Sequence, residues 1–202
     1  KMSKSKKNVI DPENIVNLYG ADTARWFVLS DSPPDRDLEW TESGIAGSFK
    51  FINKVWDLAN QSLLIKNENI IENKEEILVT KLEETISTVT KNIEEFHYNK
   101  AIANLYEIIN ALQKLILNKN ITKKTSVDAI KKISLLFQPF IPHLSEELWK
   151  LMSGEGLVIN QKWPAGKTLD KKIHNIAVQI NGKTKEIIIF EGETSKEDVM
   201  SK

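Results

Sequence analysis

The chain contains no cysteine, which excludes disulfides, thiolate zinc sites and cysteine nucleophiles. Arginine is scarce as well: of the 28 basic residues only Arg25 and Arg36 are arginine, so lysine must provide most contacts to anions. The three histidines lie far apart in the sequence, and none has the HExxH spacing of a zinc-binding helix. The sequence therefore predicts no metal site.

Long apolar runs are absent too. No stretch approaches the 18 apolar residues of a membrane span, and the basic N-terminus is not followed by the apolar segment of a secretion signal. The net charge is zero, so a nucleic-acid-binding role would depend on local patches. We expect a cytoplasmic protein without membrane contacts. Because the sequence opens on Lys1 inside a motif, we also expect it to be part of a longer protein.

The first seven residues, KMSKSKK, interleave lysines with the small hydroxyl residues Ser3 and Ser5. Lysine supplies mobile positive charge for phosphate, and serine lets the backbone come close to it. A loop of this composition can close over a triphosphate and balance the charge that builds up as pyrophosphate leaves. A solvated basic tail would have the same composition, so composition alone leaves both interpretations open.

Two short helices are predicted next. Asp11, Pro12 and Glu13 have the pattern of a helix start, and Gly20 of a helix end. The second helix runs from residue 22 to residue 30 and ends before two prolines. We expect its apolar face to consist of Ala24, Phe27 and Val28.

From Thr41 to about residue 152 the spacing of apolar residues predicts an antiparallel bundle of four to five amphipathic helices. The expected core stripes, helix by helix, are Ile45, Phe49, Ile52, Trp56, Ala59 and Leu63; Leu82, Ile86, Val89, Ile93 and Phe96; Ile102, Leu105, Ile109, Leu112 and Ile116; and Val127, Ile130, Ile133 and Phe137. Phe96, His97 and Tyr98 together suggest either a base-stacking platform or packing at a helix junction, and their position favours packing.

The C-terminal stretch changes character. Ile176, Val178 and Ile180 alternate with other residues as in a strand, Asn181-Gly182 predicts a tight hairpin turn, and residues 185–190 predict the return strand. A hairpin followed by one helical turn is marginal alone, so this unit is expected to be truncated.

Several motifs resemble class I aminoacyl-tRNA synthetases. KMSKS, then KNVIDP and YGADTARWFVL, resemble the leucyl, isoleucyl, valyl and methionyl subgroup, and FHYNKAIANLYEIINAL and PFIPHLSEELW resemble its anticodon-binding domain. PPDRDLEW, WP and VQINGK are similar to the bacterial leucyl-tRNA synthetase family in particular. The resemblance covers nearly the whole chain.

This resemblance implies a mainly α fold, an antiparallel helical bundle followed by a small truncated α+β unit with a β-hairpin. It divides the chain into residues 1–40, the end of a catalytic domain with its loop and connection; 41–155, the helical tRNA-binding domain; and 156–202, a linker and truncated C-terminal tRNA-binding unit. The sequence contains no HIGH-type motif, so these residues alone are expected to be inactive.

The resemblance also implies the site residues. The ATP phosphates would contact Lys1, Met2, Ser3, Lys4 and Ser5, with Lys4 making the direct catalytic contact and Lys1 supporting it. The expected tRNA contacts are Lys119, Lys123, Lys124, Lys183 and Lys185. Lys185 and Glu186 depart from the family, which usually has arginine and glycine there.

The whole enzyme would be a monomer that joins leucine to ATP, with magnesium, and passes the leucyl group to tRNA(Leu). A valyl or isoleucyl enzyme shares KMSKS, NVIDP and the helical domain and stays an alternative. A helical interaction module without nucleotide chemistry is a second alternative, and a bundle that serves mainly as a rigid spacer is a third.

Overall fold

The computed structural model describes Ser5, residues 9–167, and the two segments 173–180 and 183–191. The chain divides into two compact units, Lys1–Lys167 and Thr168–Lys202. The described part of the first unit is helical, and the described part of the second is a pair of strands.

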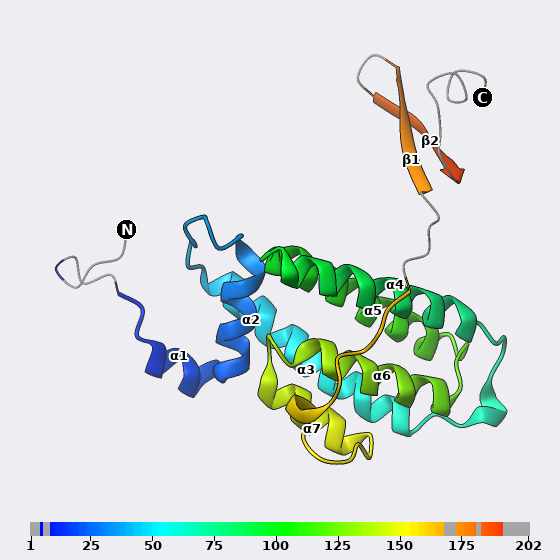
Figure 1. The fold of residues 1–202 in the computed structure, drawn as a ribbon, viewed down its shortest axis with the longest axis horizontal. Helices are drawn as coiled ribbons and strands as arrows, with labels where there is room; N and C mark the ends of the chain where they lie inside the picture. The colour runs from blue at the N-terminus through cyan, green and yellow to red at the C-terminus, as the bar shows by residue number, and fades with distance from the viewer. Residues whose placement is uncertain (1–4, 6–8, 168–172, 181–182, 192–202) are drawn as a thin grey trace. The chain divides into compact units, whose positions relative to one another are not determined.

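Seven α-helices make up the first unit, where residues are described. They are α1 (Pro12–Tyr19), α2 (Ala21–Asp31), α3 (Glu42–Leu63), α4 (Glu75–Glu94), α5 (Tyr98–Leu117), α6 (Lys123–Phe137) and α7 (Pro142–Leu151), with short 3-10 turns at Asn67–Asn69 and Val158–Asn160. Helices α3 to α6 lie side by side and alternate in direction, so their connections fall at the two ends of the bundle (Figure 1). The mainly helical, antiparallel bundle is as the sequence predicted.

The start and end of α1 follow from local chemistry. The side chain of Asp11 accepts a hydrogen bond from the backbone of Glu13, and Pro12 occupies the first turn, where no donor is lost. Gly20 ends the helix with φ of 85°, a conformation that glycine adopts at little cost. These three predictions are confirmed.

Helix α2 enters the bundle through Trp26, which is fully buried. Its ring stacks on Phe51 with centroids 4.9 Å apart, meets the edges of two further phenylalanines, and its Nε1 donates to the hydroxyl of Tyr106 at 2.8 Å. Burial raises the pKa of Tyr106, and this hydrogen bond opposes the rise. The predicted face of α2 is therefore wrong in part: Phe27 is buried, but Val28 is 46% exposed. Trp26 and Phe27 enter two separate apolar clusters.

Two charged side chains fasten α2 to the link between α6 and α7. Asp22, 8% exposed, accepts from the backbone N–H of Leu144 at 2.6 Å, and its Oδ1 lies 2.8 Å from His143 Nδ1. Asp22 thereby caps α7, whose own N-cap residue makes no side-chain cap. Arg25 donates to the carbonyls of Phe140 and Pro139, both at 2.8 Å. Helix α2 thus provides partners for the Leu144 amide in the first turn of α7 and for the carbonyls of Pro139 and Phe140 in the link.

The predicted core stripe of α3 is confirmed in part: Ile45 and Ala59 are buried, and Ile52 and Leu63 pack against the core, but two of the predicted residues do not. Phe49 and Trp56 are 39% and 37% exposed, while the buried apolar residues run through Phe51, Val55 and Leu58. Both stripes have helical spacing, and the predicted stripe, with Phe49 and Trp56, contains the larger side chains. The true face includes small Ser62, which accepts from Ser126 Oγ at 2.6 Å and so permits close contact with α6.

The predicted stripes of α4, α5 and α6 are confirmed at most positions. Buried are Leu82, Ile86, Val89, Ile102, Leu105, Ile109, Leu112, Ile130, Ile133 and Phe137, and partly buried against them are Ile93, Ile116 and Val127. Phe96 is the exception. It lies beyond the end of α4 and is 64% exposed, so packing does not account for it, although neighbouring Tyr98 does pack on the core.

In the second unit, β1 (Ile173–Ile180) and β2 (Lys183–Glu191) pair antiparallel. Val178 pairs with Glu186 and Gln179 with Thr184, which leaves Lys185 between two paired positions as in a β-bulge. The predicted turn at Asn181-Gly182 and the predicted final helical turn lie outside the described residues. The truncated α+β unit as a whole stays a prediction.

Candidate nucleic-acid interface

The structure separates the predicted site residues into three groups. Lys1, Met2, Ser3 and Lys4 lie outside the described residues, and Ser5 is described and exposed. Lys183 and Lys185 belong to strand β2, and the structure describes their place in the strand pairing. Lys119, Lys123 and Lys124 are exposed around the α5–α6 turn, so the structure brings these three together.

We call residues 66–75 and 118–124 the lysine corner. The α3–α4 connection lies against the α5–α6 turn at one end of the bundle (Figure 1). The backbone of Ile71 donates to the carbonyl of Lys119 at 3.0 Å, and the N–H of Lys123 donates to Asn67 Oδ1, also at 3.0 Å. Two loops far apart in sequence therefore form one surface. It carries the exposed lysines Lys66, Lys119, Lys123 and Lys124, together with exposed Glu68 and with Lys74, which pairs with Glu72 at 2.8 Å.

Glu75, at the start of α4, clamps this corner. Its Oε1 accepts from the backbone N–H of Thr122 at 2.9 Å and from the Thr122 hydroxyl. Burial raises the pKa of Glu75, but hydrogen bonds from Thr122, Thr125 and Asn73 outweigh this and bring it down to about 2. The carboxylate stays ionised next to the N-terminus of α6, where negative charge is favourable.

The two lysines that begin α6 do not favour the helix. Lys123 and Lys124 stand in the first turn, which contains no acidic residue, and positive charge there opposes the helix dipole. Glu75 offsets this from another helix. The arrangement concentrates cations at the surface without gaining helix stability, which is the pattern of a surface that binds anions.

Lys119 stands in a conformation that suits glycine. The N–H of Lys119 donates to the carbonyl of Ile116 at 3.0 Å, and the N–H of Asn120 donates to the carbonyl of Leu115 at 2.9 Å. Helix α5 therefore ends in a Schellman motif, with Lys119 at the left-handed position and a φ of 56°. Among the described residues, none of the lysines at positions 119, 123 and 124 has a carboxylate within ion-pair distance. Their charge is available to a partner.

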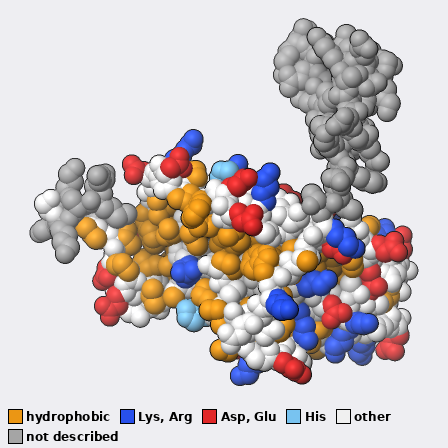
Figure 2. Space-filling model, in the orientation of Figure 1, with side chains coloured by type: hydrophobic (Ala, Val, Ile, Leu, Met, Phe, Trp, Pro, Cys, Tyr) orange, Lys and Arg blue, Asp and Glu red, His pale blue; other side chains and the backbone are white. Residues whose placement is uncertain are grey.

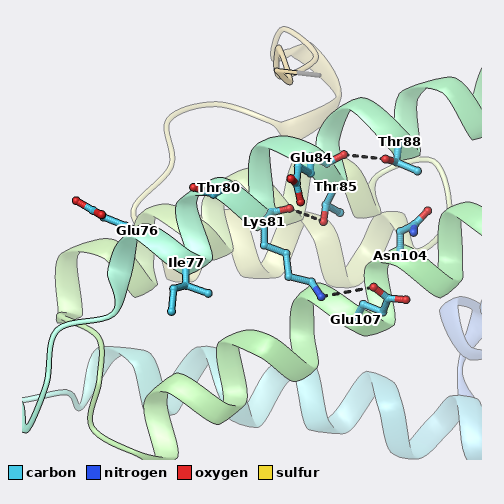
Figure 3. A pocket seen from close by; sticks show the side chains of 9 residues that line it. All are labelled: Glu76, Ile77, Thr80, Lys81, Glu84, Thr85, Thr88, Asn104 and Glu107. Carbon is cyan, nitrogen blue, oxygen red and sulfur yellow. Dashed lines mark hydrogen bonds and ion pairs between the residues drawn. The ribbon is translucent and has the colours of Figure 1, made fainter. Parts of the chain in front are cut away.

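The outer face of α4 and α5 has the opposite character. A groove of about 580 Å³ there is lined by Glu76, Glu84 and Glu107, and its lysine, Lys81, is 3.5 Å from Glu107 (Figure 3). This surface, which we call the acidic groove, would repel phosphates. On the face drawn in Figure 2, Lys and Arg side chains lie over α6, interspersed with Asp and Glu side chains.

Sequence reasoning missed Glu75 and Asn67. Glu75 lies 47 residues from its partner Thr122, and Asn67 lies 56 residues from Lys123, so no local pattern relates them. The Thr122 cap, which accepts from the backbone of Thr125 at 3.3 Å, was the one signal visible in the sequence.

Glu75 gives a prediction about acid stability. Replacing it with glutamine should lower the free energy of unfolding at pH 7 by about 1–3 kcal/mol, because an ionised acceptor is replaced by a neutral one. The folded-state pKa is below the unfolded one, so the ionised carboxylate contributes stability above about pH 4.5, and this contribution is lost as the pH falls towards 2. Urea unfolding at pH 7 and pH 3 measures both effects. Glu76→Gln, on the exposed neighbour, is the control, and an equal pH dependence in both variants would contradict the prediction.

A helical bundle with a cationic corner, joined to an opening lysine–serine motif, is typical of the class I tRNA synthetases. Two family models agree: "Anticodon-binding domain of tRNA ligase" matches residues 75–200, and "tRNA synthetases class I (I, L, M and V)" matches residues 1–41. The chain belongs to the family of anticodon-binding domains of tRNA ligases.

The similar curated proteins are leucine–tRNA ligases. This chain is 45% identical to the one from Orientia tsutsugamushi (strain Boryong), over 100% of this chain and 24% of the relative. It is 43% identical to one from Cereibacter sphaeroides (strain ATCC 17025), over 91% of this chain and 20% of the relative. The chain thus spans about a quarter or less of the length of these relatives. The predicted resemblance to the leucyl family is confirmed.

Solved structures show the same likeness. The ternary complex LeuRS-tRNA-LeuAMS from Agrobacterium radiobacter K84 matches with a TM-score of 0.76 and 27% identity, over 100% of this chain and 27% of that one. Methionyl-tRNA synthetase from Mycobacterium tuberculosis matches with a TM-score of 0.60 and 17% identity, over 72% of this chain and 35% of that one, which shows a shared fold. None of the helices in the described part of this chain has the length and apolar character to cross a membrane.

Proposed function

We propose that this chain is the part of a leucine–tRNA ligase that supplies the ATP-phosphate loop and docks the body of tRNA(Leu) on its helical bundle. The observation that carries the docking role is the lysine corner, where four exposed lysines lie on two segments that Glu75 and Asn67 hold together. The similarity to a synthetase solved in complex with tRNA supports it. Contacts would be made to phosphates and to the shape of the RNA rather than to base edges.

The whole enzyme would work as the family resemblance implies. Residues 1–40 would form the end of the catalytic domain. There the ATP phosphates would be held by Lys1, Met2, Ser3, Lys4 and Ser5, and ATP would bind together with magnesium. Residues 41–155 would bind the tRNA, and residues 156–202, with the strand pair and Lys183 and Lys185, would add a further tRNA contact. The enzyme would activate leucine, transfer it to tRNA(Leu), and act as a cytoplasmic monomer.

The salt dependence of tRNA binding tests the docking role. The 202-residue chain should bind a tRNA(Leu) transcript with an affinity that falls steeply between 50 and 200 mM salt in a filter-binding assay. The triple variant Lys119→Gly, Lys123→Ala, Lys124→Ala should bind more weakly and reduce the slope of log affinity against log salt by about 2–3, since each phosphate contact contributes about 0.7–0.9. Glycine at position 119 suits the left-handed backbone, so a loss of binding would not reflect a loss of stability.

The matched control replaces three exposed lysines outside the corner, Lys50, Lys150 and Lys162, with alanine. It removes the same charge and should change the slope by less than one contact. Equal effects of the two triple variants would mean that the corner is not the docking surface. No salt-dependent affinity for the transcript in the unaltered chain would favour the alternative of a helical interaction module without a role in RNA binding.

A further inference from the structure

A second pocket lies at the other end of the bundle from the lysine corner. Its volume is about 430 Å³, and it is formed by the turn between α2 and α3 and the junction between α4 and α5. Its lining includes Pro33, Pro34, Arg36, Phe96, Asn99 and Lys100. We call it the Phe96 pocket. This size suits a single nucleotide or a similar small group.

Phe96 has no evident role in the fold. The N–H of Phe96 donates to the carbonyl of Ile93 at 3.0 Å, and that of His97 donates to Asn92 at 2.7 Å. Helix α4 therefore ends in a Schellman motif with Phe96 at φ 59°, the position where glycine is favoured. The ring is 64% exposed and meets the edge of Tyr98 with centroids 5.9 Å apart. A strained backbone that holds a large aromatic ring in solvent points to a surface function.

The polar groups of the pocket suit a nucleotide. Arg36 is placed by a tight turn in which its N–H donates to the carbonyl of Pro33 at 3.0 Å. Lys100 stands in the first turn of α5, which has no acidic residue. The Oδ1 atom of Asn99 is buried without a hydrogen-bond partner, so it is an acceptor that a bound donor would satisfy.

Two acidic residues also face the pocket and must be weighed. Glu95 is engaged, because its carboxylate lies 3.2 Å from His97 Nδ1 and 3.9 Å from Lys91. Asp35 stands on the exposed turn beside Arg36. Glu95 is thus accounted for by His97 and Lys91. Arg36 and Lys100 outnumber Asp35, the one carboxylate of the lining that has no cation within ion-pair distance among the described residues.

We propose that the Phe96 pocket binds one unpaired nucleotide of the RNA. Its base stacks on the ring of Phe96, its phosphate lies against Arg36 and Lys100, and Asn99 Oδ1 accepts a hydrogen bond from a base amino group or a ribose hydroxyl. Stacking on an aromatic ring together with cationic phosphate contacts is the usual way in which proteins hold unpaired bases. The proposal rests on the proposed tRNA-docking function and adds a second contact at the opposite end of the bundle.

Four variants of the 202-residue chain test the proposal against a tRNA(Leu) transcript in the filter-binding assay. Phe96→Gly should weaken binding by about 5-fold to 100-fold, leave the salt slope unchanged, and leave the thermal unfolding midpoint unchanged or higher. Phe96→Trp should retain the affinity. Ile77→Ala, at a 61% exposed residue of the acidic groove, is the control and should bind as the unaltered chain does. The double variant Arg36→Ala, Lys100→Ala should reduce the salt slope by about 1–2.

The proposal is overturned if Phe96→Gly binds the transcript with unchanged affinity. It is also overturned if Phe96→Trp loses as much affinity as Phe96→Gly. If the lysine-corner variant weakens binding while the Phe96 variants do not, the tRNA-docking function stands and the nucleotide pocket is wrong. If the unaltered chain does not bind the transcript, both fall together.

Discussion

Replacing Trp26 with alanine should lower the free energy of unfolding of the 202-residue chain by about 3–5 kcal/mol. The ring is fully buried, stacks on Phe51, and donates to the hydroxyl of Tyr106. Its removal leaves a cavity where α2 meets the bundle and takes the hydrogen-bond donor from a half-buried tyrosine. Urea unfolding followed by circular dichroism measures the effect.

Trp56→Ala is the matched control for this measurement. It deletes the same side chain from α3, where the ring is 37% exposed, and should cost about 1 kcal/mol or less. Similar losses in both variants would contradict the central place given to Trp26. A further variant, Trp26→Phe, keeps most of the apolar volume and separates the hydrogen bond to Tyr106 from the packing of the ring.

The second large effect concerns the ATP loop. In a full-length leucine–tRNA ligase that carries this sequence, Lys4→Ala should slow leucyl-adenylate formation by about 10²–10³-fold, equivalent to about 3–4 kcal/mol of transition-state stabilisation. The Lys4 ammonium would stabilise charge that builds up as pyrophosphate leaves, so the affinity for ATP should change much less. Leucine-dependent pyrophosphate exchange and single-turnover adenylation measure the rate, and ATP titration measures the affinity.

Lys7→Ala, in the same lysine run but beyond KMSKS, is the control and should reduce the rate only slightly. If Lys4→Ala weakens ATP binding as much as it slows adenylation, the lysine contributes uniform binding and not transition-state stabilisation. Exchange driven by valine or isoleucine in place of leucine would retain the role of the loop and change the amino acid assigned to the enzyme.

Local signals were sufficient for much of the fold. Asp11, Pro12 and Gly20 determine the limits of α1 through contacts with near neighbours in the sequence. The stripes of α5 were also predicted, because that helix has one apolar face and its buried positions follow a single period. When a helix packs on a single surface, the period of its apolar residues is therefore sufficient to predict which positions are buried.

The errors arose where two surfaces compete for one helix. Helix α3 has two apolar stripes. The buried one is selected by tertiary packing: Phe51 packs on Trp26, Tyr106 and Phe137, and Ser62 contacts α6. Helix α2 directs adjacent residues into two clusters, which no single face describes. For the site, lysine composition predicted the cations of the α5–α6 turn, but not the Glu75 clamp that holds them, since that contact spans 47 residues.

The contacts of α2 have a mechanical consequence. Asp22 binds the first turn of α7, and Arg25 binds the carbonyls that precede this helix. Helix α2 and the α6–α7 link should therefore move as one rigid body. The chain runs from the lysine–serine loop through α1 into this rigid body, and Gly20 is the hinge residue between α1 and α2. A displacement of the loop that passes beyond Gly20 would therefore reach α7 through Asp22 and Arg25, and it would reach α3 through the stacking of Trp26 on Phe51.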